Sequence, residues 1–160
     1  MKIDTEKTIV SAVKENESHQ KRIERVVMLL KGVLPASVLS FQQYSEEEIE
    51  HVDQFIYRFS KMQDSLGARL IPALYSFLEG DQTPRPFLDI LNRFEKLGII
   101  ESVEDWQFFR NLRNNLAHDY PESLAQTVET LNLLHDEINR FLSIFQRLKQ
   151  TWTEHSSGTM

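Results

Sequence analysis

The chain contains no cysteine. This absence excludes disulfides, zinc sites built on thiolates and a cysteine nucleophile, and it is compatible with a reducing compartment. Glycine and proline are also scarce, with five of each among 160 residues. Because a fold of many short strands needs frequent turns at these two residues, the sequence favours a few long elements.

The sequence also lacks a long apolar run. No uncharged stretch approaches the length of about 18 residues that spans a bilayer, and the first residues carry no apolar segment of signal-peptide type. We therefore expect a soluble cytoplasmic protein without a membrane partner. Hydrophobic residues make up 41% and charged residues 26% of the chain, which is typical of a folded domain rather than a disordered one.

Positive charge is in the minority. Eighteen Lys and Arg stand against 24 Asp and Glu, which gives a formal net charge of -6. A chain of this charge repels a polyanion at long range. Any contact with a nucleic acid must therefore depend on a local group of basic residues.

Apolar residues recur at spacings of three and four through most of the chain, which indicates amphipathic helices. The clearest helix begins at Ser45, which forms a capping box with Glu48, and it stops at Gly80. Pro72 lies inside this helix, so we expect a kink near residues 67–72. Four further helices are expected, and they cover residues 23–34, 84–98, 103–120 and 122–150. Ser102 is the expected cap of the helix over 103–120, whose apolar residues face inward, namely Trp106, Phe109, Leu112 and Leu116.

No segment shows the alternation of a β-strand, and no internal repeat occurs. The sequence therefore predicts an all-α protein, an up-and-down bundle of four to five helices that forms a twofold homodimer. We assign residues 1–150 to this single domain and residues 151–160 to a frayed C-terminal tail.

Polar residues concentrate in WQFFRNLRNNLAHDYP, at positions 106–121. On an ideal helix Arg110, Asn114 and His118 follow at spacings of four and share one polar stripe beside the core face. His118 is expected in the last turn, where the helix C-terminus favours the imidazolium. Taken alone, this pattern is more typical of a solvated helix face than of a catalytic site.

The run from Arg113 to Tyr120 resembles the Arg-x4-His-x-Tyr signature of the HEPN superfamily, and specifically the HepT-like branch of bacterial toxin–antitoxin systems. Asn114 follows the arginine, an apolar residue stands two positions before His118, and the tyrosine stands two positions after it. The order of the surrounding helices is also similar, so that the resemblance covers residues 20–150.

This resemblance implies a helical dimer that cleaves RNA without a metal or cofactor, as the toxin of a type VII-like pair neutralised by a nucleotidyltransferase antitoxin. It gives Arg113 and His118 the catalytic positions, and it makes Tyr120 the residue to which the antitoxin transfers AMP. Arg110 and Asn114 are accessory polar residues. The expected partners are thus RNA, the nucleotidyltransferase and a second copy of the chain, without DNA.

The chemistry of RNA cleavage is compatible with these residues. It needs a base for the 2′-hydroxyl, an acid for the leaving 5′-oxygen and a cation beside the phosphorane, and a twofold dimer supplies two copies of each group. Five residues correspond to about 140° around a helix, so Arg113 and His118 point apart on one straight helix. Either the helix loosens before His118, or the two groups converge across the dimer axis.

Two other interpretations remain open. The same fold serves as a catalytically silent subunit that docks on a nucleotidyltransferase and helps to position its substrate, and a plain helical adaptor needs neither activity. Other candidate residues carry less weight. His19, His51, His135 and His155 lack the i, i+4 spacing of a helical metal pair, and the sequence has no glycine-rich phosphate loop.

Overall fold

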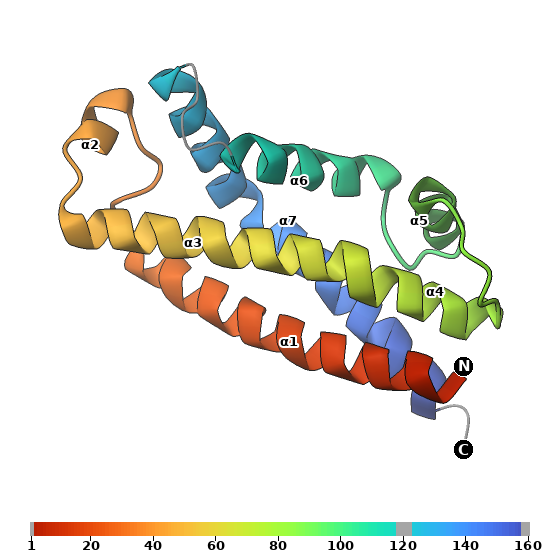
Figure 1. The fold of residues 1–160 in the computed structure, drawn as a ribbon. Coiled ribbons are helices and arrows are strands. Elements are labelled where there is room, and N and C mark those ends of the chain that lie inside the picture. Colours follow the sequence, from red (N-terminus) through yellow and green to blue (C-terminus); the bar gives the residue numbers. More distant parts are fainter. Residues whose placement is uncertain (1, 118–122, 158–160) are drawn as a thin grey trace.

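The computed structural model describes residues 2–117 and 123–157, and within these ranges it contains helices and no β-strand (Figure 1). The prediction of an all-α protein is confirmed for this part of the chain. The elements are, in order, α1 (Lys2–Leu29), α2 (Val38–Gln42), α3 (Glu46–Ser65), η1 (Leu66–Leu70), α4 (Ile71–Glu79), α5 (Phe87–Lys96), α6 (Val103–Leu116) and α7 (Leu124–Ser157). Since α3, η1 and α4 are continuous, they form one long rod.

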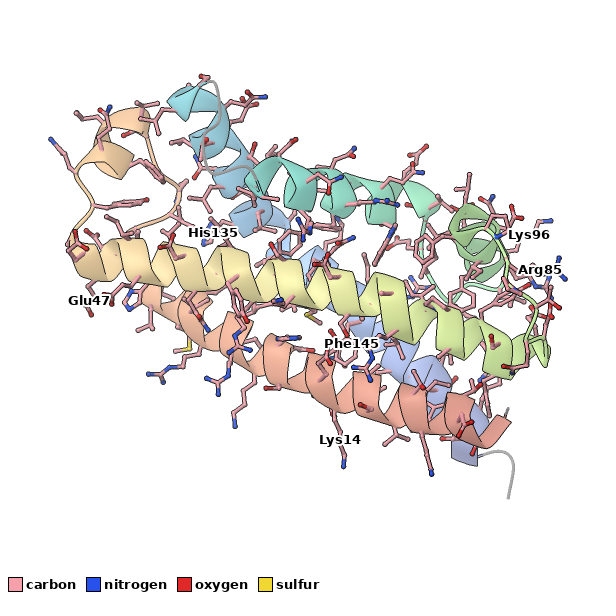
Figure 2. All side chains as sticks on the ribbon, viewed as in Figure 1. Lys14, Glu47, Arg85, Lys96, His135 and Phe145 are labelled. Atoms are coloured by element: carbon pink, nitrogen blue, oxygen red, sulfur yellow. The ribbon has the colours of Figure 1, made fainter. Side chains whose placement is uncertain are left out.

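Three long rods, namely α1, α3 with η1 and α4, and α7, enclose the apolar core, and α6 packs across α3 and α7 (Figure 1). The ring of Phe59 on α3 meets that of Phe141 on α7 at 4.8 Å, and the ring of Phe109 on α6 meets that of Phe141 at 5.2 Å. Figure 2 shows Phe145 among the helices, whereas Lys14 extends from the surface of α1. These aromatic contacts fix α6 against the other two helices.

The helix boundaries follow local signals in the sequence. The Ser45 hydroxyl accepts from the Glu48 amide at 3.1 Å, and the Ser45 amide donates to the Glu48 carboxylate at 2.9 Å, so the capping box is confirmed. Gly80 ends α4 with φ 63°, a left-handed conformation that glycine adopts without strain. The Ser102 hydroxyl accepts from the Asp105 amide at 3.0 Å and begins α6 as expected.

The distortion expected near Pro72 takes the form of a π-helical turn. In η1 the Ile71 amide donates to the Leu66 carbonyl, one residue further back than in an α-helix. Pro72 then occupies the first turn of α4, where the amide hydrogen that proline lacks is not required. The rod therefore passes through the proline without ending.

Several boundaries differ from those predicted, and α6 among them ends at Leu116 rather than at residue 120. A single helix α1 covers residues 2–29 where the sequence predicted a stripe over 23–34, and the short α2 was not predicted. The last helix continues to Ser157 rather than fraying after residue 150, because the ring of Trp152 packs on Phe77 at 5.0 Å. No helix in the described ranges combines the length and the apolar character that crossing a bilayer requires.

Candidate functional site

Arg110, Arg113 and Asn114 lie in the last two turns of α6 and face one open cavity of about 530 Å³. Their spacing of three and four residues puts them on one side of the helix. One wall of the cavity comes from α3 and η1, and the other comes from α6. The lining residues are Gln63, Asp64, Gly67, Ala68, Phe87, Trp106, Arg110, Arg113 and Asn114.

The apolar side of α6 determines this orientation. Trp106, Phe109 and Leu112 are buried, with at most 4% of each residue exposed, as the sequence predicted. Because these residues recur at a spacing of three, they leave the polar residues of the last two turns at the edge of the core. The polar stripe is thus a direct consequence of how α6 packs on Phe59 and Phe141.

Arg113 forms a two-point ion pair with Asp64 on α3. Its Nε donates to Oδ1 and its Nη2 donates to Oδ2, both at 2.9 Å. The hydrogen bond to this carboxylate raises the pKa of the Arg113 guanidinium above its ordinary value. Two of the five N–H donors of the guanidinium are occupied, and the remaining three stay available to a ligand.

Arg110 differs from Arg113 in that it carries an uncompensated charge. It is exposed, and it makes neither an ion pair nor a hydrogen bond with any residue in the described part of the chain. Asn114, one helical turn further on, is also exposed. The cavity therefore presents one free cation and one cation held by an acid.

Gln63 is a cavity residue that sequence reasoning missed. Only 5% of this residue is exposed, and its amide has no hydrogen-bond partner among residues 2–117 and 123–157. Asp64 was also missed as the partner of Arg113. Neither residue carries a local signal, because both lie in a polar stretch of α3 that becomes part of a site only when α6 packs beside it.

Gly67 on η1 allows the indole of Trp106 to approach the long rod closely. A Cβ atom on Gly67 would lie 3.0 Å from Cζ2 of Trp106, which is closer than packed carbon atoms normally come. The indole Nε1 is buried without a hydrogen-bond partner among the described residues. The floor of the cavity is thus a tightly packed aromatic side chain.

Arg113 also borders a second cavity, of about 460 Å³, on the side that leads to the end of α6. Tyr57 and Asp53 of α3 line this cavity, together with Asn115 and Ala117. The Arg113 side chain therefore lies between the two cavities.

The helix α6 ends at Leu116, and the Ala117 amide donates to the Arg113 carbonyl at 3.0 Å as the C-cap. The helix thus ends before His118, whereas the sequence predicted that it continues to residue 120 with His118 in its last turn. The Ala117 cap ends the helical hydrogen bonding earlier than the spacing of apolar residues indicated. His118, Tyr120 and Pro121 themselves lie outside the described residues.

The other histidines lie away from this cavity on separate elements. His19 on α1 faces α3, where its Nδ1 lies 3.3 Å from Nη1 of Arg58. His135 on α7 meets the ring of Phe55 edge-on at 6.4 Å. Over the described ranges, no group of three acidic or histidine side chains comes close enough to hold a metal ion.

Comparison of the chain with protein-family models, with curated proteins and with solved structures finds no match. The structure by itself defines an all-helical protein with a cavity lined by arginines and aromatic residues at the end of α6. The resemblance to the HEPN superfamily therefore rests on the residues of the sequence, and its functional implications are proposals.

Proposed function

We propose that the protein is a metal-independent endoribonuclease of the HEPN type, the toxin of a type VII-like toxin–antitoxin pair. The observation that carries this proposal is that Arg110, Arg113 and Asn114 face one open cavity, directly before His118 in the sequence. Guanidinium groups bind phosphate oxygens through paired hydrogen bonds. Two of them beside a cavity of about 530 Å³ suit a phosphodiester and its neighbouring sugar.

In the proposed reaction His118 removes the proton from a ribose 2′-hydroxyl, whose oxygen attacks the adjacent phosphorus. The bond from phosphorus to the 5′-oxygen breaks, and the second copy of His118 in a twofold homodimer protonates that oxygen. The product is a 2′,3′-cyclic phosphate. Arg113 stabilises the negative charge of the phosphorane, while Arg110 and Asn114 hold the flanking backbone.

A cognate nucleotidyltransferase neutralises this activity in our proposal. Tyr120 follows His118 by two positions, and an AMP group attached there introduces a phosphate beside Arg113. That phosphate competes with RNA for the same guanidinium. The neutralisation thus acts on the residues that perform the cleavage.

A second candidate function is a catalytically silent subunit that binds a nucleotidyltransferase and positions its substrate. Two observations favour it. The Arg113 guanidinium is already held by Asp64, and the chain has a net charge of -6, which weakens the attraction of RNA at long range.

A cleavage assay on purified protein separates these candidates. We expect the unchanged chain to cleave single-stranded RNA in the presence of a metal chelator, and Arg113→Ala and His118→Ala to lower the rate by about 100-fold or more. Both variants should keep the helical circular-dichroism spectrum, since truncation at the end of a helix costs little stability.

Arg22→Ala is the matched control, because Arg22 is an exposed arginine on α1 that makes no ion pair within the described ranges. It should cleave RNA at the unchanged rate. Full activity in both Arg113→Ala and His118→Ala would place the chemistry elsewhere in the molecule. Absence of cleavage by the unchanged chain would leave the silent subunit as the better interpretation.

A further inference from the structure

The side-chain amide of Gln63 is the most unusual polar group of the cavity. It belongs to a residue that is only 5% exposed, it lines the cavity, and no described residue donates to it or accepts from it. The amide atoms themselves are not fully buried, so they reach the open space of the cavity, where water or a ligand can pair with them. Gln63 thus presents one acceptor and two donors to whatever enters the cavity.

The aromatic lining of the cavity comes from two different helices. Phe87 on α5 and Trp106 on α6 have ring centroids 5.7 Å apart, and Gly67 adds no side chain between Trp106 and the long rod. Aromatic side chains offer surfaces on which the bases of single-stranded nucleic acid stack. Only 3% of Trp106 is exposed, so Phe87, which is partly exposed, offers the stacking surface and Trp106 forms the apolar floor beside it. The apolar part of the cavity is therefore suited to a flat heterocycle.

The charged part of the cavity lies on α6 beside this lining. Arg110 is exposed and has no ion-pair partner among the described residues, and the orientation of Arg113 is held by Asp64. A free guanidinium next to an aromatic surface is suited to a ligand in which a phosphate is joined to a base. A cavity of about 530 Å³ is also within the usual size of a small-molecule site.

We propose that this cavity is a nucleotide-binding pocket in which Phe87 and Trp106 contact the base, Gln63 hydrogen-bonds to the base edge, and Arg110 binds the phosphate. A glutamine amide pairs in two places with the N6 amino group and N7 of adenine, so the pocket favours adenine over cytosine. The occupant is a nucleotide of a single-stranded RNA chain. The choice of RNA as the occupant rests on the proposed function. A free nucleotide carries the same base and phosphate and is the other ligand that the experiment tests.

Binding is measured by calorimetry with ligands that cannot be cleaved. The probes are AMP, CMP, and short oligoadenylate and oligocytidylate whose 2′-hydroxyls are methylated. We expect the oligoadenylate to bind about tenfold more tightly than the oligocytidylate. Gln63→Met keeps the volume but loses the amide, and it should abolish this preference, whereas Arg110→Gln should weaken both oligonucleotides by a similar factor.

Two control variants match these changes at other positions. Gln54→Met alters a glutamine on the same helix α3, and Arg22→Gln alters an exposed arginine on α1. Both should bind each probe like the unchanged protein. If the oligoadenylate binds more tightly than the oligocytidylate, the result supports an RNA occupant. If only AMP binds more tightly than CMP, the result supports the pocket with a free nucleotide as its occupant.

Equal binding of adenine and cytosine probes would overturn the proposal, and so would an unchanged preference in Gln63→Met. These outcomes are independent of catalysis. A preference that depends on Gln63 in a protein that cleaves no RNA would overturn the ribonuclease proposal and support the pocket. Conversely, cleavage of RNA at the same positions by Gln63→Met and by the unchanged chain would support the ribonuclease and overturn the pocket.

Discussion

Asp64 controls the charge that Arg113 offers to a ligand. The two side chains are partly exposed, 28% for Arg113 and 48% for Asp64, and an exposed pair of this kind stabilises a protein by at most about 1 kcal/mol. The proposed RNA phosphate has to compete with this carboxylate. The ion pair therefore affects ligand binding more than it affects folding.

We predict that Asp64→Asn tightens the binding of a non-cleavable RNA by up to about fivefold, which corresponds to about 1 kcal/mol, with little change in stability. Filter binding measures the dissociation constant. Asp81→Asn is the control, since it makes the same change in net charge and removes the partner of Arg85 at a different place. An equal gain in both variants would mean that overall charge, and not the ion pair with Arg113, limits binding.

His19 links stability to pH. Burial lowers its pKa below the ordinary value of 6.5, as do the charges of Arg58 and Lys61, while the charge of Glu15 opposes this shift. Below pH 6.5 the unfolded chain therefore binds a proton at His19 more readily than the folded chain. Stability is fully retained above the unfolded pKa and is lost as the pH falls through this window.

We predict that the melting temperature falls when the pH is lowered from about 7.5 to about 5.5, and that His19→Gln shows a smaller fall. Calorimetry of the two proteins at each pH gives the comparison. His155→Gln, near the exposed end of α7, should behave like the unchanged protein. The same fall in all three proteins would show that other groups produce the acid sensitivity.

At the scale of helices, two side chains cap the start of α6, since the Glu95 carboxylate accepts from the Val103 amide at 2.7 Å beside the Ser102 cap. The Ser102 hydroxyl satisfies the Asp105 amide, one of the donors that the first turn of a helix leaves free. α6 has 14 residues and carries the candidate site at its other end. The position of that end therefore depends on the cap and on the burial of Trp106 and Phe109.

We predict that Ser102→Ala lowers the free energy of unfolding by about 1 kcal/mol, because the amide of Asp105 loses its partner. Urea denaturation followed by circular dichroism measures the change. In Ser143→Ala the lost hydroxyl lies in the interior of α7, where it donates only to the Arg140 carbonyl, so this variant should be close to neutral. A neutral Ser102→Ala would show that packing alone sets the start of α6.

The π-helical turn η1 accommodates two residues that disfavour a regular helix, Gly67 and Pro72. Its wider spacing accepts Pro72 in the next turn, and Gly67 within it makes room for Trp106. The long rod can therefore remain continuous beside α6. A regular α-helix with alanine at position 67 would separate the rod from the floor of the cavity.

At the scale of the whole molecule, the proposed chemistry requires two copies of the chain. One Arg113 and one His118 do not provide a base, an acid and a phosphate clamp at the same time. In the proposed homodimer, a twofold axis near the end of α6 brings both copies of these residues to one cleft. In that cleft the arginines of both copies lie together, although the net charge of the chain is negative.

We predict a homodimer in solution, with a mass by light scattering of twice the 18.8 kDa of the chain. Mixing Arg113→Ala with His118→Ala should not restore cleavage, because every mixed dimer contains only one His118 and so lacks either the base or the acid. Each variant alone, at the same total concentration, is the control. A monomer at high micromolar concentration would contradict the composite cleft.

Local physics made much of this fold predictable from the sequence. Helix caps at Ser45 and Ser102 and the stop at Gly80 depend on hydrogen bonds within a few residues, and the buried face of α6 follows from apolar spacing. The shared face of Arg110 and Asn114 has the same origin, although the sequence analysis did not place Arg113 on it. These features were predicted because their causes lie within one helix.

Only the tertiary structure decided which residues share the cavity. Gln63 and Asp64 come close to α6 because α3 packs beside it, and they are too far from α6 in the sequence for a local pattern to predict this. The last turns of α7 likewise depend on the contact between Trp152 and Phe77. The sequence by itself determined where α3 and α6 begin, where α4 ends and which face of α6 is apolar. The packing of the helices determined that a glutamine amide, two aromatic rings and two guanidinium groups surround one space, because burial energy depends on partners far apart in the chain.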